Sequence, residues 1–218
     1  MDKIVLICAT GRSGSTTMQR IINTIPNSNI CGENYGAITS LLDFYIKIHK
    51  TSSENRLQMS LPYDALIANK MKPAWYNSYN TTEMDDKIRE LIIAMFKKDS
   101  NTTLWGFKEI RYDNNKINYI KYFKLLFPQT KVIIQVRENL VAQSQSSWHK
   151  QNPNATAYLK QCNKELFEFY NNNKEWCYFT SFERMFNANN ITKIFDFIEC
   201  RENFNESAVA DVIRNNIE

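Results

Sequence analysis

One stretch near the N-terminus constrains the fold more than any other. An apolar run at residues 3–8 has the length of a buried strand, and a turn rich in glycine and hydroxyl residues follows at 10–17. Apolar side chains then recur with helical spacing, at Met18, Ile21, Ile22 and Ile25. A strand, a glycine-rich turn and a helix in this order gather backbone N–H groups and a helix N-terminus around one point, which is the geometry that binds phosphate. We therefore expect a phosphate-bearing ligand at this turn.

The residue types in the turn suit that role. Gly11 and Gly14 allow unusual backbone angles and a close approach of the ligand. Arg12 can add charge-assisted hydrogen bonds, and the hydroxyl residues add further donors. The candidate binding residues of the turn are Arg12, Ser13, Gly14, Ser15, Thr16 and Thr17.

Three other interpretations of the turn are weaker or simpler. A nucleotide kinase or ATPase would show GxxxxGK[ST], but no lysine follows Gly14. A nucleophile elbow would need serine in the middle of G-x-S-x-G, whereas residues 11–15 end in serine and no Ser–His–acid set is evident. A capped helix start without any ligand also fits this turn.

Short apolar runs alternate with helical patterns along the rest of the chain, which predicts an α/β fold with a parallel sheet. Strands are expected at 3–8, 30–31, 104–107, 131–135 and 176–179. Helices are expected at 18–25, 38–46, 88–96, 116–126, 139–149, 155–170, 189–199 and 207–215. Residues 51–83 are the least regular stretch and are expected to form an insertion on the acceptor side, where Trp75, Tyr76 and Tyr79 form either a stacking wall or a local cluster.

Composition sets broader limits. A length of 218 residues fits a single domain, 1–218, and 27 Lys and Arg against 23 Asp and Glu give a net charge of +4. That charge suits a small anionic ligand, and the lack of a basic run argues against a nucleic-acid partner. The five cysteines form no CxxC pair, so we expect no zinc or other metal site. The first apolar run is too short for a signal peptide or a membrane span, which predicts a soluble, cytoplasmic protein.

Several stretches together resemble a known family. Residues 11–16, Gly-Arg-Ser-Gly-Ser-Thr, resemble the 5'-phosphosulfate loop of sulfotransferases that use 3'-phosphoadenosine 5'-phosphosulfate (PAPS), notably the carbohydrate and tyrosylprotein groups. Residues 30–34 are similar to the Cys-Gly-Glu segment of the tyrosylprotein enzymes. Residues 105–111 resemble the strand that delivers a lysine to the sulfate, and residues 136–146 resemble the 3'-phosphate motif. Residues 179–185 also resemble the family's late strand and helix.

The resemblance implies a role for each matched residue. Glu33 would be the general base, and Lys108 would stabilise charge on the bridging oxygen. Arg137 would bind the 3'-phosphate together with Ser146, or with Ser144 instead. Many relatives have serine eight residues after this arginine, but Gln145 stands there. Two family features have no clear counterpart: the Gly-rich adenosine motif of the cytosolic enzymes and their histidine base, since the only histidines are His49 and His149.

The resemblance further implies a P-loop-containing three-layer fold, with about five parallel strands flanked by helices. The expected activity is sulfuryl transfer from PAPS, with PAP as product and no metal, to a carbohydrate, a peptide tyrosine, a small hydroxyl compound or an amine. Glu109 and Arg111 would be partners of these groups or acceptor contacts. Two alternatives stay open: a P-loop kinase or phosphotransferase, and a non-catalytic domain that binds PAP or another nucleotide. Neither the strand order nor the oligomeric state can be read from the sequence.

Overall fold

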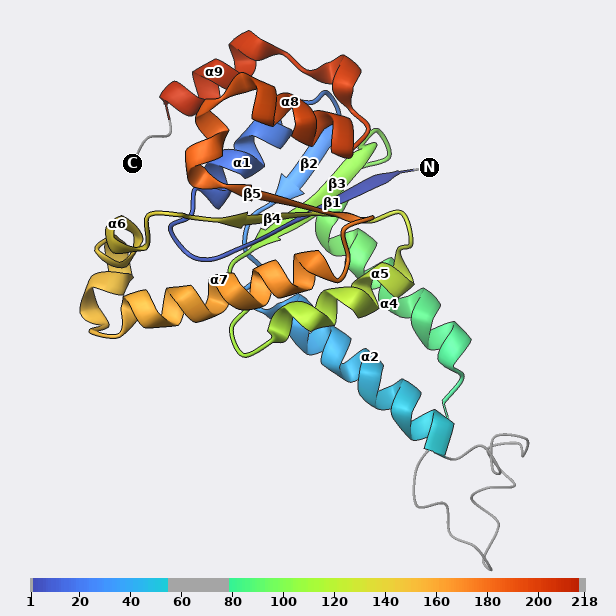
Figure 1. Ribbon diagram of the computed structural model, residues 1–218. Coiled ribbons are helices and arrows are strands. Elements are labelled where there is room, and N and C mark those ends of the chain that lie inside the picture. The colour runs from blue at the N-terminus through green and yellow to red at the C-terminus, as the bar shows by residue number, and fades with distance from the viewer. Residues whose placement is uncertain (1, 55–78, 216–218) are drawn as a thin grey trace, which may run out of the picture.

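The centre of the molecule is a five-stranded parallel sheet (Figure 1). The computed structural model describes residues 2–54 and 79–215. The sheet has the order β2-β3-β1-β4-β5. The strands are β1 (Lys3–Ala9), β2 (Ser28–Cys31), β3 (Leu104–Glu109), β4 (Lys131–Val136) and β5 (Cys177–Ser181). The predicted α/β class and the parallel sheet are confirmed.

Helices cover both faces of the sheet and make three layers (Figure 1). One face carries α1 (Ser15–Ile22), α8 (Ala188–Phe197) and α9 (Glu206–Arg214). The other carries α2 (Ala37–Glu54), α4 (Thr81–Phe96), α5 (Ile120–Leu126) and α7 (Ala155–Asn171). The short helix α6 (Leu140–Ser144) follows β4, and single 3₁₀ turns lie at Lys116–Tyr119, Ser147–Gln151, Phe182–Phe186 and Arg201–Asn203.

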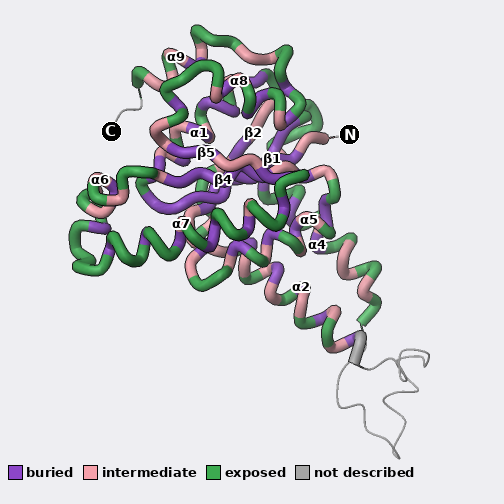
Figure 2. Tube along the Cα trace, in the orientation of Figure 1, coloured by how far each residue is buried: buried purple, intermediate pink, exposed green. Residues whose placement is uncertain are grey.

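Alternate residues of each strand point into two separate hydrophobic cores, one on each face of the sheet. In β1, Leu6 points into the core shared with α2, α4, α5 and α7, and Ile7 points into the core shared with α1 and α8. Both side chains are fully buried. A strand covered on both faces is apolar throughout rather than alternating, which explains the unbroken run at the N-terminus. Figure 2 shows this buried band running through the sheet.

The strand register brings the polar loops to one edge. Cys8 of β1 pairs with Glu109 at the end of β3, and Ala9 pairs with Gln135 near the end of β4. The loops that leave these three strands therefore start side by side at the carboxyl edge of the sheet. Parallel α/β sheets bind ligands at this edge.

Two predictions need correction. The single helix expected at 139–149 ends at Ser144, and Ser146 is extended, with φ −100° and ψ 132°. The cause is tertiary: the buried Gln143 side chain donates hydrogen bonds of 3.0 Å to the Thr10 hydroxyl and 2.7 Å to the Gly11 carbonyl. Both ends of the stretch expected to be irregular, 51–83, are helical, because α2 runs to Glu54 and α4 begins at Thr81. Trp75 and Tyr76 lie outside the described residues.

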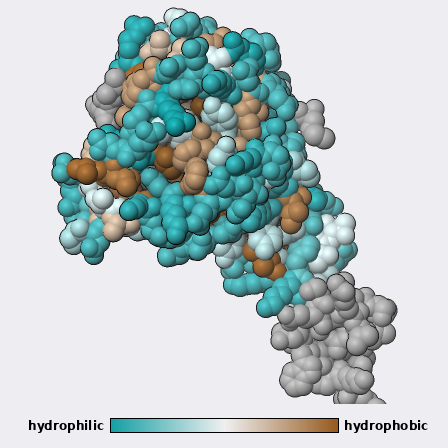
Figure 3. All heavy atoms as spheres, viewed as in Figure 1, coloured by the Kyte–Doolittle hydropathy of each residue, from teal (hydrophilic) through white to brown (hydrophobic). Residues whose placement is uncertain are grey.

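The face seen in Figure 3 is mostly hydrophilic, with hydrophobic residues at α6 and near the edge strand β5. The rings of Phe167 and Tyr170 on α7 lie 5.2 and 5.5 Å from the ring of Phe179 on β5. Among the described residues, no helix is long and apolar enough to cross a membrane.

Candidate active site

The loop after β1 is shaped by left-handed backbone and by buried hydrogen bonds. Arg12 and Gly14 have φ of 62° and 77°. At Gly14 a side chain would also collide with Phe182, since a Cβ would lie 2.5 Å from its ring. The Ser13 hydroxyl is buried and donates a 2.7 Å hydrogen bond to the Thr10 carbonyl. Ser13 therefore shapes the loop, and its hydroxyl is committed to the backbone.

Helix α1 begins immediately after this loop. Its N-cap is Gly14, and no side chain caps its first turn by a hydrogen bond. The first N–H groups of a helix have no partner within the helix and carry a partial positive charge. They are therefore available to an anion.

A cavity of about 670 Å³ adjoins this helix start. It brings together nine of the eleven residues that the sequence singled out for the site, from four segments of the chain. These are Arg12, Gly14, Ser15, Thr16, Thr17, Glu33, Lys108, Arg137 and Ser146. Arg20, Phe182 and Trp148 line it as well, and Ser13 and Ser144 do not.

Glu33 and Lys108 form an ion pair inside this cavity. The Lys108 ammonium lies 2.6 Å from Oε1 of Glu33, and their side chains are 6% and 30% exposed respectively. Nη1 of Arg111 lies 2.9 Å from Oε2 of Glu33 and 2.7 Å from Glu109. Lysine 108 thus pairs with Glu33, and the adjacent Glu109 pairs with Arg111.

Glu109 holds the loop that carries Glu33. Its Oε2 accepts hydrogen bonds from the backbone N–H groups of Asn34 (3.2 Å) and Gly36 (3.1 Å). Its Oε1 accepts another from the N–H of Ile110, at 2.8 Å. A buried carboxylate with this many donors is fully satisfied and fixes the position of both loops. Glu109 is therefore a positioning residue.

Opposing effects set the pKa of the Glu33 carboxyl. Partial burial acts to raise this pKa, and it is the largest single effect. The hydrogen bonds and charges of Lys108 and Arg111 act against it and together hold the pKa below the ordinary glutamate value. Glu33 is therefore a carboxylate at neutral pH, in the proton-accepting form.

A second group of cations, Arg137 and Arg12, lies at the loop after β1 and is called the Arg137 corner below. Nη1 of Arg137 donates a 3.4 Å hydrogen bond to the Arg12 carbonyl, and its guanidinium stacks 4.7 Å above the ring of Phe182. Nε of Arg137 is buried and has no hydrogen-bond partner among the described residues. The Arg12 side chain donates a 3.0 Å hydrogen bond to the Ser146 hydroxyl. Two guanidinium groups and a hydroxyl thus meet in one corner of the cavity.

The structure separates the two candidate serines. Ser146 lines the cavity, whereas the Ser144 hydroxyl donates a 2.9 Å hydrogen bond to the Val141 carbonyl within α6. Helical spacing could not separate them, because the helix ends between them.

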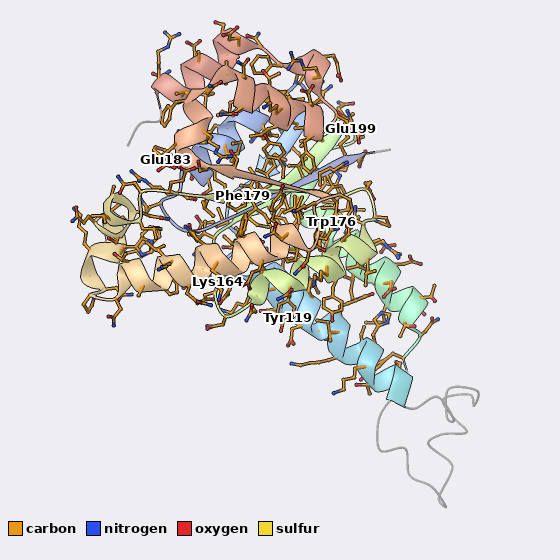
Figure 4. All side chains as sticks on the ribbon, viewed as in Figure 1. Tyr119, Lys164, Trp176, Phe179, Glu183 and Glu199 are labelled. Carbon is orange, nitrogen blue, oxygen red and sulfur yellow. The ribbon has the colours of Figure 1, made fainter. Side chains whose placement is uncertain are left out.

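Several supporting residues were missed by sequence reasoning. Glu183, labelled in Figure 4 just after β5, accepts hydrogen bonds from the N–H groups of Glu138 (3.0 Å) and Asn139 (3.1 Å). It thereby fixes the loop that follows Arg137. Gln135 donates a 2.8 Å hydrogen bond to the Ser13 carbonyl. The only sign of these contacts in the sequence is a glutamine within or near an apolar segment, at Gln135 and Gln143. Sequence reasoning could not find their partners, which are more than 120 residues away.

Within residues 2–54 and 79–215, no cluster of three or more His, Cys, Asp or Glu side chains could hold a metal ion.

The profile of a sulfotransferase family matches residues 5–195. The chain belongs to the sulfotransferase family. A search of the curated proteins found no match for this family member. Among solved structures, it is similar to a sulfotransferase domain from the curacin biosynthetic pathway, with 16% identity, a TM-score of 0.52, and 97% and 78% of the two chains covered. At that identity the likeness shows the fold alone, and it confirms the predicted P-loop-containing fold.

Two other solved sulfotransferases are more distant. Mouse SULT7A1, complexed with PAP, has 15% identity and a TM-score of 0.46 over 99% of this chain. STF1 from Mycobacterium tuberculosis has 9% identity and a TM-score of 0.48, with 98% of this chain and 71% of that chain covered. This sulfotransferase-family chain spans 65% of the length of the mouse protein.

Proposed function

We propose that this chain transfers the sulfuryl group of PAPS to a hydroxyl or amine acceptor. One observation carries the proposal: a single cavity contains an uncapped helix start, the Arg137 corner and the Glu33–Lys108 pair. PAPS bears anionic groups at its 5' and 3' positions, so it needs two separate anion sites in one cavity. The buried, unpartnered Nε of Arg137 fits such a ligand, because an unsatisfied buried donor is costly.

The two ends of the cavity would divide the nucleotide between them. Backbone N–H groups at the start of α1 and the hydroxyls of Ser15, Thr16 and Thr17, which line the cavity, would bind the 5'-phosphosulfate. Arg137, Arg12 and Ser146, which contact one another, would bind the 3'-phosphate. Phe182 keeps the Arg137 guanidinium in orientation by stacking on it.

When bound, PAPS would supply the sulfuryl group. Glu33, as a carboxylate between two cations, accepts the proton of the acceptor hydroxyl or amine. Lys108 stabilises negative charge on the oxygen that bridges phosphate and sulfate, after exchanging its contact with Glu33 for one with that oxygen. Arg111 keeps Glu33 in place through the second carboxylate oxygen.

The proposal predicts that Glu33→Gln separates binding from turnover. Glutamine keeps the shape of the side chain but removes its basicity, so PAP affinity should stay near wild type while turnover falls about 10²–10⁴-fold. Transfer of labelled sulfuryl from PAPS to an acceptor panel measures this, with the exposed Glu90→Gln as matched control. Full activity in Glu33→Gln would remove Glu33 from the mechanism.

The same assay separates the alternatives. A wild-type protein that binds PAP but transfers to no acceptor would be a non-catalytic nucleotide-binding domain. A kinase would bind ATP with Mg²⁺ in preference to PAP, and it would need the metal. Sulfuryl transfer that is unaffected by a chelator is the expected result.

A further inference from the structure

A second cavity, of about 420 Å³, adjoins the cavity of about 670 Å³ that is proposed to bind PAPS. Ile110 and Trp148 line both cavities, so the two share a wall. Arg111 lines the second cavity, and its Nη1 lies 2.9 Å from Glu33 in the first. The Arg111 side chain therefore links the second cavity to Glu33. The volume is within the range of small-molecule sites, roughly 300–1,000 Å³.

The charged groups that line the second cavity are already paired. Lys116 lies 2.7 Å from Asp113, and Arg111 is shared between Glu33 and Glu109. An anionic acceptor, such as an acidic peptide, would find no uncompensated cation in this wall. The charge balance favours a neutral acceptor.

The remaining wall combines aliphatic and aromatic side chains with the polar groups of Thr10, Asn152 and Tyr158. Leu166 and Ile110 contribute aliphatic surface, and Trp148 and Tyr158 contribute aromatic rings. The Thr10 hydroxyl is already bonded to the side chains of Asn163 and Gln143. A sugar carries more hydroxyls than Asn152 and Tyr158 can pair, and the remaining hydroxyls would lose water without gaining a partner, which costs binding energy. A phenol needs only one polar contact at its reacting end.

One buried polar atom of this wall has no partner among the described residues. His149 is 5% exposed, and its Nε2 forms no hydrogen bond within the described part of the chain. This atom lies against Gly11, where a Cβ would come within 3.3 Å of it and within 2.8 Å of the Trp148 ring. The His149 ring is therefore a candidate contact for a single polar substituent on the acceptor.

We propose that the second cavity binds the acceptor and that the acceptor is a compact, neutral phenol. The inference rests on the proposed function. The phenol hydroxyl faces Glu33, the ring lies past Ile110 and Trp148, and a polar para substituent contacts His149. Glu33 takes the phenol proton as the phenol oxygen forms its bond to sulfur and the bond from sulfur to the bridging oxygen of PAPS breaks, which leaves an aryl sulfate and PAP.

Steady-state kinetics with para-ethylphenol test the location. Ile110→Trp narrows the junction between the two cavities and should raise KM for the phenol about tenfold or more. Because Ile110 also lines the first cavity, Kd for PAP is measured in parallel, and KM for the phenol should rise several-fold more than Kd for PAP. Ile93→Trp, at a partly exposed position on α4, is the matched control. An unchanged KM in Ile110→Trp would overturn the assignment of the cavity.

A pair of phenols that differ in the para substituent tests the contact with His149. Wild type should prefer para-acetylphenol over para-ethylphenol more strongly than His149→Phe does, because phenylalanine keeps a ring but removes the nitrogen. The preference is the ratio of kcat/KM for para-acetylphenol to kcat/KM for para-ethylphenol. Comparing this ratio between the two proteins cancels the intrinsic reactivity of each phenol. An equal ratio would remove His149 from acceptor binding.

The acceptor panel distinguishes this inference from the proposed function. Transfer to neutral phenols, above oligosaccharides and acidic tyrosine peptides, supports both. Preferred transfer to a sugar or an acidic peptide would overturn the phenol assignment and leave sulfuryl transfer standing. No transfer to any acceptor by a protein that binds PAP would overturn both.

Discussion

Glu33 shares its two carboxylate oxygens between two cations, and this arrangement defines the chemistry of the site. The sequence supplied Glu33 and Lys108 as candidates through their resemblance to two family segments. It could not show that they touch, because they are 75 residues apart and meet only where β2 lies beside β3. The nearer carboxylate, Glu109, was the simpler partner for Lys108 on sequence alone, and it is instead held by Arg111 and backbone N–H groups.

The pH dependence of activity should report this environment. The pKa of Glu33 lies below the ordinary glutamate value, so kcat/KM should fall only when the pH drops below that ordinary value. Arg111→Gln removes one of the two cations that lower the pKa, and the acid limb should move to higher pH. A pH profile of kcat/KM for both proteins measures the displacement. An acid limb that does not move would contradict the role given to Arg111.

At the scale of elements, hydrophobic patterns predicted the strands well because each strand is buried on both faces. They failed at residues 139–149, where the apolar spacing continued but the helix did not. A side chain buried against the distant loop, Gln143, sets the end of this helix, and no local pattern contains that information. Because the helix ends at Ser144, Ser146 lines the cavity and Ser144 does not.

Substitution of the two serines tests whether α6 ends between them. Ser146→Ala should weaken PAP binding by about 0.5–1.5 kcal/mol, the range for one hydrogen bond. Ser144→Ala should leave PAP affinity unchanged, because its hydroxyl bonds to the helix backbone. Isothermal titration with PAP measures both. The reverse pattern would place the family serine at 144.

For the whole molecule, the sequence predicted the α/β class but not the strand order. That order depends on which crossover packs against which face, and several arrangements bury the same apolar residues. Phe123 shows how the layers are joined: it is fully buried on α5, and its ring lies 5.8 Å from Phe107 of β3 and 5.1 Å from Phe127.

This packing predicts a large difference between two neighbouring positions. Phe123→Ala should lower the free energy of unfolding by about 3–5 kcal/mol, because it leaves a cavity between α5 and the sheet. Leu125→Ala, at a position 64% exposed, should change it by about 0.5 kcal/mol or less. Urea denaturation measures both values. Similar losses at the two positions would contradict the described packing of α5.

The central claim is that one nucleotide spans the start of α1 and the Arg137 corner. Affinities of wild type and Arg137→Ala for PAP and for 5'-AMP, which lacks the 3'-phosphate, test it most directly, with the exposed Arg184→Ala as control. Wild type should bind PAP more tightly than 5'-AMP, and Arg137→Ala should lose about 1.5–3 kcal/mol for PAP while binding 5'-AMP as before. An equal loss for both nucleotides, or no loss for PAP, would contradict the claim.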